Sequence, residues 1–262
     1  MLLWAQGYED IVLFHALKDV ENGFYVDVGA NSPWDCSVTK LFYEHGWHGI
    51  NVEPLEEHYR MLCEDRPRDV CVLAGAGSQE AEQELTVDDG CSSFDLDVRG
   101  RMECKGRNLE CRKIRIRKLD SILQENLTKP AQDIHFFKID VEGFEREVLE
   151  GVSLSKYRPW IITLEATDPI TQAPNHQKWE SILLSNGYEF AHEQFVNRYY
   201  VASERRELKT RFVGEDALNH DYDLYFVSHS FPRILAPISA GQLIRTTVLE
   251  IGSRVKRTLI GA

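Results

Sequence analysis

The sequence predicts a single open α/β domain with a doubly wound, mostly parallel sheet and helices on both faces. Its 262 residues are enough for one domain with a full core. Apolar and amphipathic segments alternate near the start of the chain, giving strand, helix, strand, helix and strand within about 55 residues, which is typical of a parallel sheet. Three apolar runs also end in an acidic residue: FYVDVGAN at 24–31, INVEP at 50–54 and FFKIDVEGFE at 136–145. Ligands bind at such strand ends in open α/β sheets.

Apolar spacing predicts the elements in chain order. In the first third it predicts helices over 8–20, 37–46 and 56–65 and strands over 25–29, 49–53 and 70–77. The alternation breaks between 79 and 118, where period-two patterns at 83–87 and 113–119 predict a β-excursion between strands three and four. Later segments predict helices over 119–126, 144–151 and 176–188, central strands over 135–143 and 160–166, and late, antiparallel strands over 188–194, 197–202 and 222–227.

Composition and charge narrow the classes of partner and compartment. The net charge of −12 argues against a nucleic acid partner, because a polyanion would be repelled. The N-terminal segment lacks the basic start of a signal peptide, and no window is long and apolar enough for a transmembrane helix. The six cysteines are scattered, which favours reduced thiols over a disulfide framework. We therefore expect a cytoplasmic protein.

The C-terminal segment differs in character from the rest. We expect the domain to span 1–230 and a basic, helical tail to span 231–262. This tail contains five basic residues and one acidic residue. Such a helix could pack on a partner in a homo-oligomer, dock on its own domain or lie on an anionic membrane. Docking or fraying of a terminal helix is the interpretation we favour.

The first acidic strand end predicts a site for the amino-acid part of a ligand. Gly29 allows a tight turn and a close backbone approach, and Asp27 could accept hydrogen bonds from an ammonium group. The start of the following helix could hold a carboxylate. The dinucleotide motif GxGxxG is absent, since Ala30 and Asn31 follow Gly29, which disfavours a pyrophosphate ligand. A lone D-x-G pattern is more often an ordinary turn.

The second acidic strand end changes that judgement. Glu53 follows the glycine turn by 20-odd residues, which suits a carboxylate that accepts from both hydroxyls of a ribose. An amino-acid end together with a ribose end describes S-adenosylmethionine (SAM). We therefore expect Asp27, Gly29, Asn31 and Glu53 to hold SAM, with its adenine near Ala76 after strand three.

The joint order of these motifs resembles the FkbM family of SAM-dependent O-methyltransferases. The resemblance rests on 24–54, on FFKIDVEGFEREVLEG at 136–151 and on PWIITLEA at 159–166. It extends to YEDIVLF, CSSFD at 91–95, LDSIL and NRYYVA, and so covers roughly 6–228. It implies a class I methyltransferase (Rossmann-like) fold and methylation of a hydroxyl on a sugar, glycan or natural product. CSSFD departs from the usual family segment, and the tail has no assigned counterpart.

The third acidic strand end is where the resemblance implies that methyl transfer occurs. Asp140, Glu142 and, on the next strand, Glu165 are candidates to position the acceptor or remove its proton. They could share a proton, or Asp140 and Glu165 could hold a divalent metal such as Mg²⁺. His176 is a further candidate for the base, although a single loop histidine usually has no such role.

A mixture of aromatic and polar side chains suits a saccharide acceptor. Trp34, Asn197, Arg198 and Tyr199 are the candidates, with core packing as the alternative for Trp34. The sequence therefore predicts an O-methyltransferase that acts on a sugar or glycan hydroxyl. The alternatives are methylation of a non-sugar natural product and a non-catalytic module that binds the cofactor.

Overall fold

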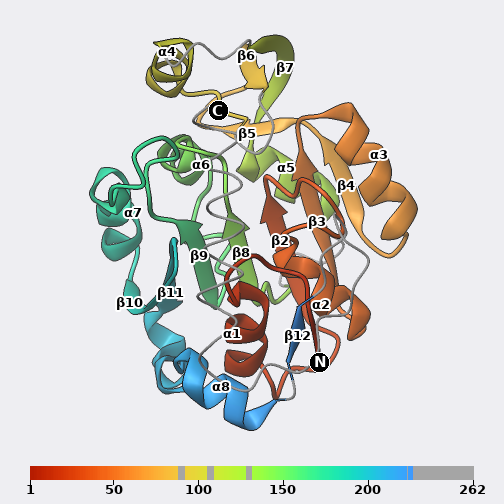
Figure 1. Ribbon diagram of the computed structural model, residues 1–262, viewed down its shortest axis with the longest axis vertical. Coiled ribbons are helices and arrows are strands. Elements are labelled where there is room, and N and C mark those ends of the chain that lie inside the picture. Colours follow the sequence, from red (N-terminus) through yellow and green to blue (C-terminus); the bar gives the residue numbers. More distant parts are fainter. Residues whose placement is uncertain (88–91, 105–108, 128–131, 223, 227–262) are drawn as a thin grey trace, which may run out of the picture.

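A seven-stranded, mostly parallel sheet forms the centre of the molecule (Figure 1). The computed structural model describes residues 1–87, 92–104, 109–127, 132–222 and 224–226. In spatial order the strands are β10 (Tyr188–Gln194), β11 (Asn197–Ala202), β9 (Ile161–Glu165), β8 (Phe136–Ile139), β2 (Phe24–Val28), β3 (His48–Glu53) and β4 (Val70–Leu73).

The strand directions confirm the predicted doubly wound sheet. β4, β3, β2, β8 and β9 pair in parallel, whereas β11 pairs antiparallel with both β9 and β10. This seven-stranded arrangement with its antiparallel β10–β11 hairpin matches the class I methyltransferase fold. The strand order reverses at β2, with β3 on one side and β8 on the other, so their carboxyl ends form the crevice where such sheets bind ligands.

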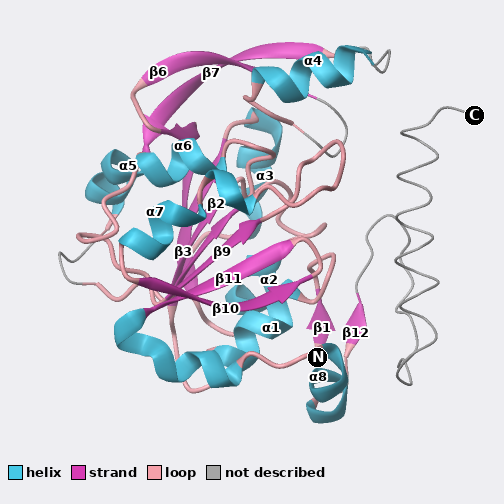
Figure 2. Cartoon of the chain, turned by 90° about the vertical axis from the view of Figure 1, so that its left-hand side faces the viewer, coloured by secondary structure: helices cyan, strands magenta, loops and turns pink. Residues whose placement is uncertain are grey.

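Helices cover both faces of the sheet, as Figure 2 shows nearly edge-on. Alternating strand residues such as Val26 and Tyr25 point to opposite faces and join two separate cores. The first core is closed by α5 (Leu119–Asn126), α6 (Glu145–Glu150) and α7 (Glu180–Ser185). The second is closed by α1 (Glu9–Ala16), α2 (Val38–Glu44), the 3₁₀ helix η2 (Ser203–Arg211) and α8 (Glu215–Asp221). Another helix, α3 (Glu56–Asp65), contacts β3 and β4.

The predicted β-excursion is a separate three-stranded sheet at one end of the molecule (Figure 1). It contains β5 (Gly75–Gly77), β7 (Glu110–Lys118) and β6 (Ala81–Val87), with α4 (Leu96–Cys104) beside it. The single strand predicted over 70–77 is wrong, because the chain leaves the central sheet at Ala74 and β5 pairs with β7 instead of β3. The sequence prediction also missed α4.

The remaining elements lie near the two ends of the described chain. Residues 176–188, predicted as one helix, form η1 (His176–Lys178), α7 and the start of β10. Of the predicted segment 222–227, β12 (Tyr225–Phe226) is a strand, but it pairs in parallel with β1 (Leu2–Leu3) outside the central sheet. None of the helices in the described ranges has the length and apolar character needed to cross a bilayer. The predicted tail over 231–262 lies outside the described residues.

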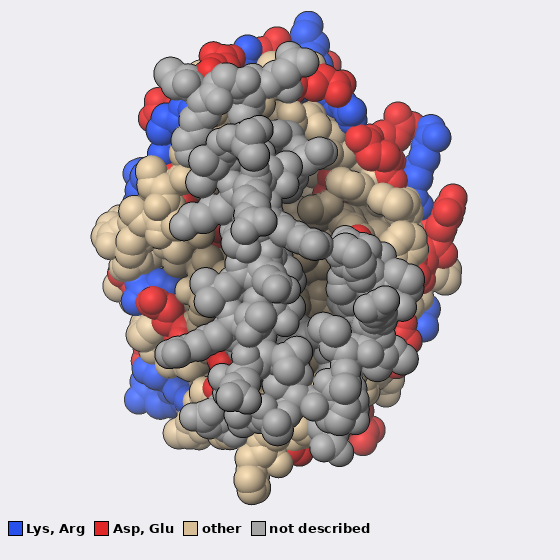
Figure 3. All heavy atoms as spheres, in the orientation of Figure 1, with Lys and Arg blue, Asp and Glu red and all other residues tan. Residues whose placement is uncertain are grey.

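Acidic and basic side chains stand next to one another around the rim of the face seen in Figure 3. Some of them link elements that are distant in the sequence, as Arg112 of β7 does with Glu57 of α3. Within the excursion, Arg99 of α4 pairs with Glu84 of β6 at 3.0 Å. Water screens exposed pairs such as these and they contribute little, so the excursion depends mainly on apolar contacts such as those of Leu85 and Ile116.

Candidate active site

At the first acidic strand end, the carboxylate of Asp27 forms a buried ion pair. Asp27, on β2, is 1% exposed, and its Oδ2 accepts a 2.8 Å hydrogen bond from the Thr39 hydroxyl. Its Oδ1 lies 3.3 Å from the Nζ of Lys138, which stands opposite it on β8. The protein's own ammonium group therefore already faces the carboxylate that we expected to receive the ligand's ammonium.

Lys138 also connects this strand end with the third one. Its Nζ donates to the carbonyl of Gly29 at 2.8 Å and lies 3.3 Å from Oδ2 of Asp140. Burial alone would lower the pKa of Lys138, but the carboxylates of Asp27 and Asp140 raise it above its ordinary value. The side chain is thus a fixed positive charge between two strand ends. The only sequence signal for this role of Lys138 was its position two residues before Asp140, which places both side chains on the same side of the strand.

The glycine turn after β2 brings β2 and β8 together. Gly29 has φ +76°, and a Cβ there would lie 2.0 Å from the backbone oxygen of Asp140. The residue at position 29 must therefore be glycine, because the end of β8 approaches it so closely. This requirement holds whether or not a ligand also approaches the turn. The turn continues with Asn31 at φ +52°, whose N–H donates to Glu53 at 2.7 Å.

Glu53, the last residue of β3, is hydrogen-bonded to the same turn. Its Oε2 accepts from Asn31 N–H, and its Oε1 accepts from Leu55 N–H at 2.8 Å. The side chain is only 3% exposed, and this burial raises the pKa of Glu53 to about 7. Each carboxylate oxygen keeps a second lone pair, so Glu53 can still accept from two ligand hydroxyls. The structure thus brings together Asp27, Gly29, Asn31 and Glu53.

A buried arginine that the sequence prediction missed supports this region. Arg66, 1% exposed, donates to the hydroxyl of Thr39 and to Ser37, and reaches the carbonyl of Pro33 at 2.9 Å. Thr39 in turn donates to Asp27. A polar chain therefore runs from Arg66 to Asp27 and fixes the loop after Gly29. No local pattern in the sequence distinguishes Arg66 from a surface residue of α3.

Two other predicted contacts lie at the border of this region. Ala76 is on β5 and is 3% exposed, because its side chain packs into the first core. Trp34 donates its indole N–H to Asp65 at 2.8 Å, so α3 fixes its ring. Trp34 lies in the loop that carries Asn31, and Ala76 lies two residues after Ala74, whose N–H donates to the carbonyl of Glu53 at 3.2 Å. A contact with a ligand remains a prediction for both Trp34 and Ala76.

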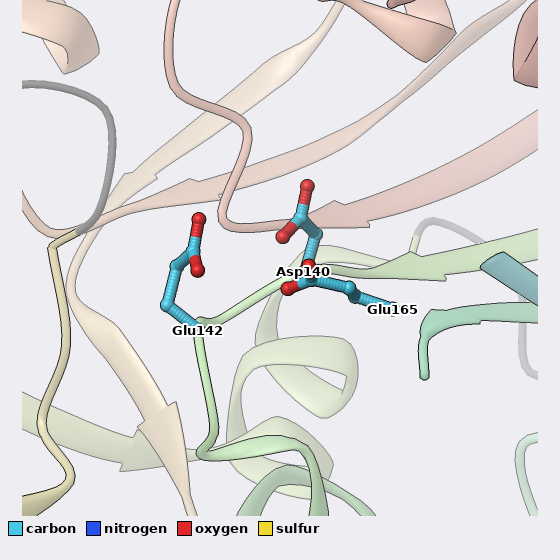
Figure 4. A group of neighbouring side chains, drawn as sticks. All are labelled: Asp140, Glu142 and Glu165. Carbon is cyan, nitrogen blue, oxygen red and sulfur yellow. The ribbon is translucent and has the colours of Figure 1, made fainter. Parts of the chain in front are cut away.

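At the third strand end three carboxylates converge (Figure 4). Asp140 follows β8, Glu142 stands on the next turn and Glu165 ends β9. One oxygen of each lies within 4.8 Å of those of the other two. The register places Ile139 beside Leu164, which brings these strand ends together. The structure therefore forms the cluster that the sequence predicted.

Glu165 is the most deeply buried member of the cluster. It is 9% exposed, and its Oε1 accepts from the Thr167 hydroxyl at 3.2 Å. Its Oε2 has no hydrogen-bond partner among the described residues. Burial, reinforced by the charges of Glu142 and Asp140, raises the pKa of Glu165 well above its ordinary value. A carboxyl group with a raised pKa can hold or release a proton near neutral pH.

Glu142 is held in an uncommon backbone conformation. Its φ is +53°, and its carbonyl accepts a 2.7 Å hydrogen bond from the hydroxyl of Ser93, which is 0% exposed. Ser93 belongs to the segment CSSFD, of which Cys91 lies outside the described residues. This segment therefore has a positioning role beside the carboxylates that the sequence prediction did not assign.

Helix α4 is anchored beside both strand ends that carry the cluster. Arg101 donates from Nη1 to both oxygens of Asp168, at 2.9 and 2.8 Å, just after β9. At the other strand end, Asp95 and Val98 lie next to Gly143, the residue after Glu142. The excursion thus contacts the segments that directly follow β8 and β9.

The other predicted residues do not all face the cluster. His176 begins η1, and among the described residues its side chain makes no hydrogen bond or ion pair with the carboxylates. Tyr199 is 0% exposed in the second core, whereas Arg198 points to the opposite face of β11 and pairs with Glu180 at 2.9 Å. Adjacent strand residues alternate between faces, so NRYYVA cannot present these two side chains to one ligand.

Asn197 reaches a further buried acid that sequence reasoning left unassigned. Its amide donates to Oε1 of Glu9 at 3.0 Å, while Gly7 N–H donates to Oε2 at 2.7 Å. Burial raises the pKa of Glu9 to about 7, and the charge of Asp140 contributes to the shift. Asn197 therefore connects α1 to the sheet near the carboxylates.

The chain is similar in sequence to one known family and, at low identity, to several solved structures. Residues 27–190 match the family model described as the methyltransferase FkbM domain. No curated protein sequence matches the chain significantly. Among solved structures, the fibrillarin pre-rRNA processing protein of Methanococcus jannaschii gives a TM-score of 0.40 at 10% identity, covering 76% of this chain and 77% of that one. A TehB-like SAM-dependent methyltransferase of Corynebacterium glutamicum gives 0.40 at 6% identity, covering 73% and 87%.

Proposed function

This chain belongs to the FkbM family of SAM-dependent methyltransferases, and we propose that it methylates a hydroxyl group of a sugar or glycan. The observation that carries the proposal is the group formed by Asp140, Glu142 and Glu165 at the strand ends next to the cofactor turn. Gly29 and Lys138 join that group directly to the predicted cofactor residues. Acceptor and cofactor would therefore meet at one edge of the sheet.

The residues of the turn fit the ribose end of SAM. Glu53 keeps free lone pairs for the two ribose hydroxyls, whereas the N–H groups of Ala30 and Asn31 already donate to Val52 and Glu53. Because Lys138 already faces Asp27, that pair would set the charge of the turn and compete with a ligand ammonium. When bound, SAM supplies an electrophilic methyl group on a sulfonium.

The carboxylates suit an alcohol acceptor, which must lose a proton as it gains a methyl group. In its ionised form Glu165 can take that proton, and Asp140 and Glu142 can accept hydrogen bonds that orient the hydroxyl. The new bond joins the methyl carbon to the acceptor oxygen as the carbon–sulfur bond breaks. Orientation alone can supply roughly 7–11 kcal/mol of the barrier.

An acceptor with several neighbouring hydroxyls would make the most hydrogen bonds to these three carboxylates. Three carboxylates within 4.8 Å of one another offer acceptors on adjacent positions, as the vicinal hydroxyls of a saccharide require. The half-exposed Asp140, with 40% of its side chain accessible, leaves the cluster open on one side. This supports a sugar over an isolated hydroxyl on an apolar natural product.

The test is methyl transfer from isotopically labelled SAM to a panel of acceptors. The panel contains free sugars, nucleotide sugars and glycans, each with its matched deoxy analogue, and a set of phenolic and polyketide alcohols. We expect label and a mass gain of one methylene on a sugar, lost with one particular deoxy analogue. Transfer to the natural-product alcohols alone would overturn the choice of acceptor, and binding of SAM without any transfer would favour a non-catalytic module.

A further inference from the structure

We propose that Asp140, Glu142 and Glu165 bind one hard divalent cation such as Mg²⁺ or Mn²⁺. The binding rests on the geometry of these three side chains alone. Its effect on catalysis rests on the proposed function, which it deepens by naming how the acceptor oxygen would be held.

The ligand set comes from rigid elements. Asp140 and Glu165 stand at the ends of adjacent parallel strands, β8 and β9. Glu142 is held at φ +53° by the hydrogen bond from Ser93 to its carbonyl. Carboxylate oxygens are the ligands that hard divalent cations prefer, and Mg²⁺ commonly uses one to three of them with waters.

Glu165 gives the second, independent indication. Its Oε2 is buried without a hydrogen-bond partner among the described residues, although the side chain is only 9% exposed. An unpartnered buried carboxylate oxygen is costly, because nothing replaces the water that it has lost. Figure 4 shows this carboxyl group beside that of Asp140, within the cluster. A cation at this point would satisfy the oxygen directly.

The charge of the neighbourhood also favours a cation. Glu145, 1% exposed on α6, adds a fourth carboxyl group close to the three ligands. The ammonium group of Lys138 lies 3.3 Å from Asp140 and is shared with Asp27. One shared ammonium group cannot balance the cluster, so an excess of negative charge remains in a partly buried place.

The distances suit a single ion with few side-chain movements. In an octahedron with metal–oxygen distances near 2.1 Å, ligand oxygens lie about 3.0 Å apart in cis positions and about 4.2 Å in trans positions. The three oxygens here lie within 4.8 Å of one another. Two oxygens 4.8 Å apart would have to approach by about 0.6 Å to reach the trans distance and by about 1.8 Å to reach the cis distance, which rotamer adjustments can supply. The accessible side of Asp140 would leave positions for water or an acceptor oxygen.

A cation there would change how the hydroxyl is activated. It would act as a Lewis acid on the acceptor oxygen, so the hydroxyl proton would leave more readily. The three carboxylates would then serve as ligands, and the proton would pass to water on the accessible side of Asp140 instead of to Glu165. Two adjacent hydroxyls of a saccharide could bind the same ion, which agrees with the proposed acceptor.

The test is Mn²⁺ binding to the purified full chain without methyl donor or acceptor. Manganese electron paramagnetic resonance and calorimetry are measured on the wild type, Glu165→Gln, Glu142→Gln and the matched control Glu147→Gln, which removes the same charge from α6. We expect one site per chain with a dissociation constant below about 1 mM in the wild type and Glu147→Gln. We expect binding at least tenfold weaker in both Glu165→Gln and Glu142→Gln. Circular dichroism identifies any variant that fails to fold.

Two results would overturn the inference. One is no Mn²⁺ site in the wild type at millimolar concentrations, and the other is equal binding by the wild type and a folded Glu165→Gln or Glu142→Gln variant. S-adenosylhomocysteine is titrated in parallel to separate the two proposals. Normal binding of this ligand without any Mn²⁺ site removes the metal and leaves the proposed function. Mn²⁺ binding without S-adenosylhomocysteine binding removes the function and leaves the metal site.

Discussion

The ammonium group of Lys138 lies 3.3 Å from Oδ1 of Asp27, across two adjacent strands and almost out of contact with solvent. The same ammonium group lies 3.3 Å from Asp140, which belongs to the carboxylate cluster. The turn that would hold the cofactor and the strand end that would hold the acceptor therefore share one positive charge. A change at Lys138 should affect both.

We predict that Lys138→Met destabilises the protein by about 3–5 kcal/mol, because it leaves the buried carboxylate of Asp27 without its partner. Urea unfolding measures the change, with Lys156→Met, at an exposed position, as the control. The double variant Asp27→Asn/Lys138→Met should lose less stability than the sum of the two single variants. An additive result would contradict the coupling between these residues.

We predict that Gly29→Ala destabilises the protein by about 2–4 kcal/mol and abolishes cofactor binding. The added Cβ would lie 2.0 Å from the backbone oxygen of Asp140, and φ is +76°. Gly100→Ala is the matched control, since Gly100 lies in α4 and a Cβ there meets nothing within 4 Å. Thermal unfolding should show a gain of about 0.5–1 kcal/mol for Gly100→Ala. Equal effects of the two changes would argue against the close approach of β2 and β8.

We predict that the affinity for S-adenosylhomocysteine rises about tenfold between pH 6 and pH 8. The pKa of Glu53 is raised to about 7 by burial, so its carboxyl group is mostly protonated at pH 6 and mostly ionised at pH 8. Only the ionised form can accept from both ribose hydroxyls, so the fraction competent to bind grows as the pH rises. Calorimetry at several pH values measures this.

The controls for this pH profile change one charge each. Glu53→Gln should bind weakly with a flat profile, because the titrating group is gone. Glu56→Gln, on the exposed first turn of α3, should keep the wild-type profile. An unchanged profile in Glu53→Gln would assign the titration to another group.

We predict that Ser93→Ala lowers the rate of methyl transfer about tenfold or more with little change in cofactor affinity. The Ser93 hydroxyl donates to the carbonyl of Glu142, so its loss releases the turn that places that carboxylate. A buried carbonyl without its donor should also lower stability by about 1–3 kcal/mol. Steady-state kinetics and calorimetry are compared with Ser121→Ala on α5. Loss of cofactor affinity with normal turnover would contradict this positioning role.

The acidic strand ends could be predicted from the sequence because parallel strands place their carboxyl ends on one edge. Apolar runs before Asp27, Glu53 and Asp140 predicted β2, β3 and β8, and the register brings their ends together. Glu165 followed from the same rule on β9. The cluster therefore follows from the order of the parallel strands. The alternation of strands and helices in the sequence predicts such a sheet.

Long-range contacts explain what could not be predicted. The ion pair between Lys138 and Asp27 and the buried position of Arg66 depend on neighbours that no local pattern identifies. Helix α4 has charged residues at four of its nine positions and, among its described side chains, buries only the pair Val98 and Met102, so its sequence LDVRGRMEC carries a weak apolar pattern. The break at Ala74 also depends on β7, whose residues pair with β5 from more than 30 positions away.

The most direct test of the account is to measure turnover and cofactor affinity together in Glu165→Gln. The structure separates Glu53, on the cofactor turn, from Glu165, in the acceptor cluster. With saturating labelled SAM and the saccharide acceptor, kcat should fall at least about 100-fold, while the dissociation constant of S-adenosylhomocysteine stays within twofold of the wild type. Wild-type turnover in this variant would contradict the assignment of the third strand end to catalysis.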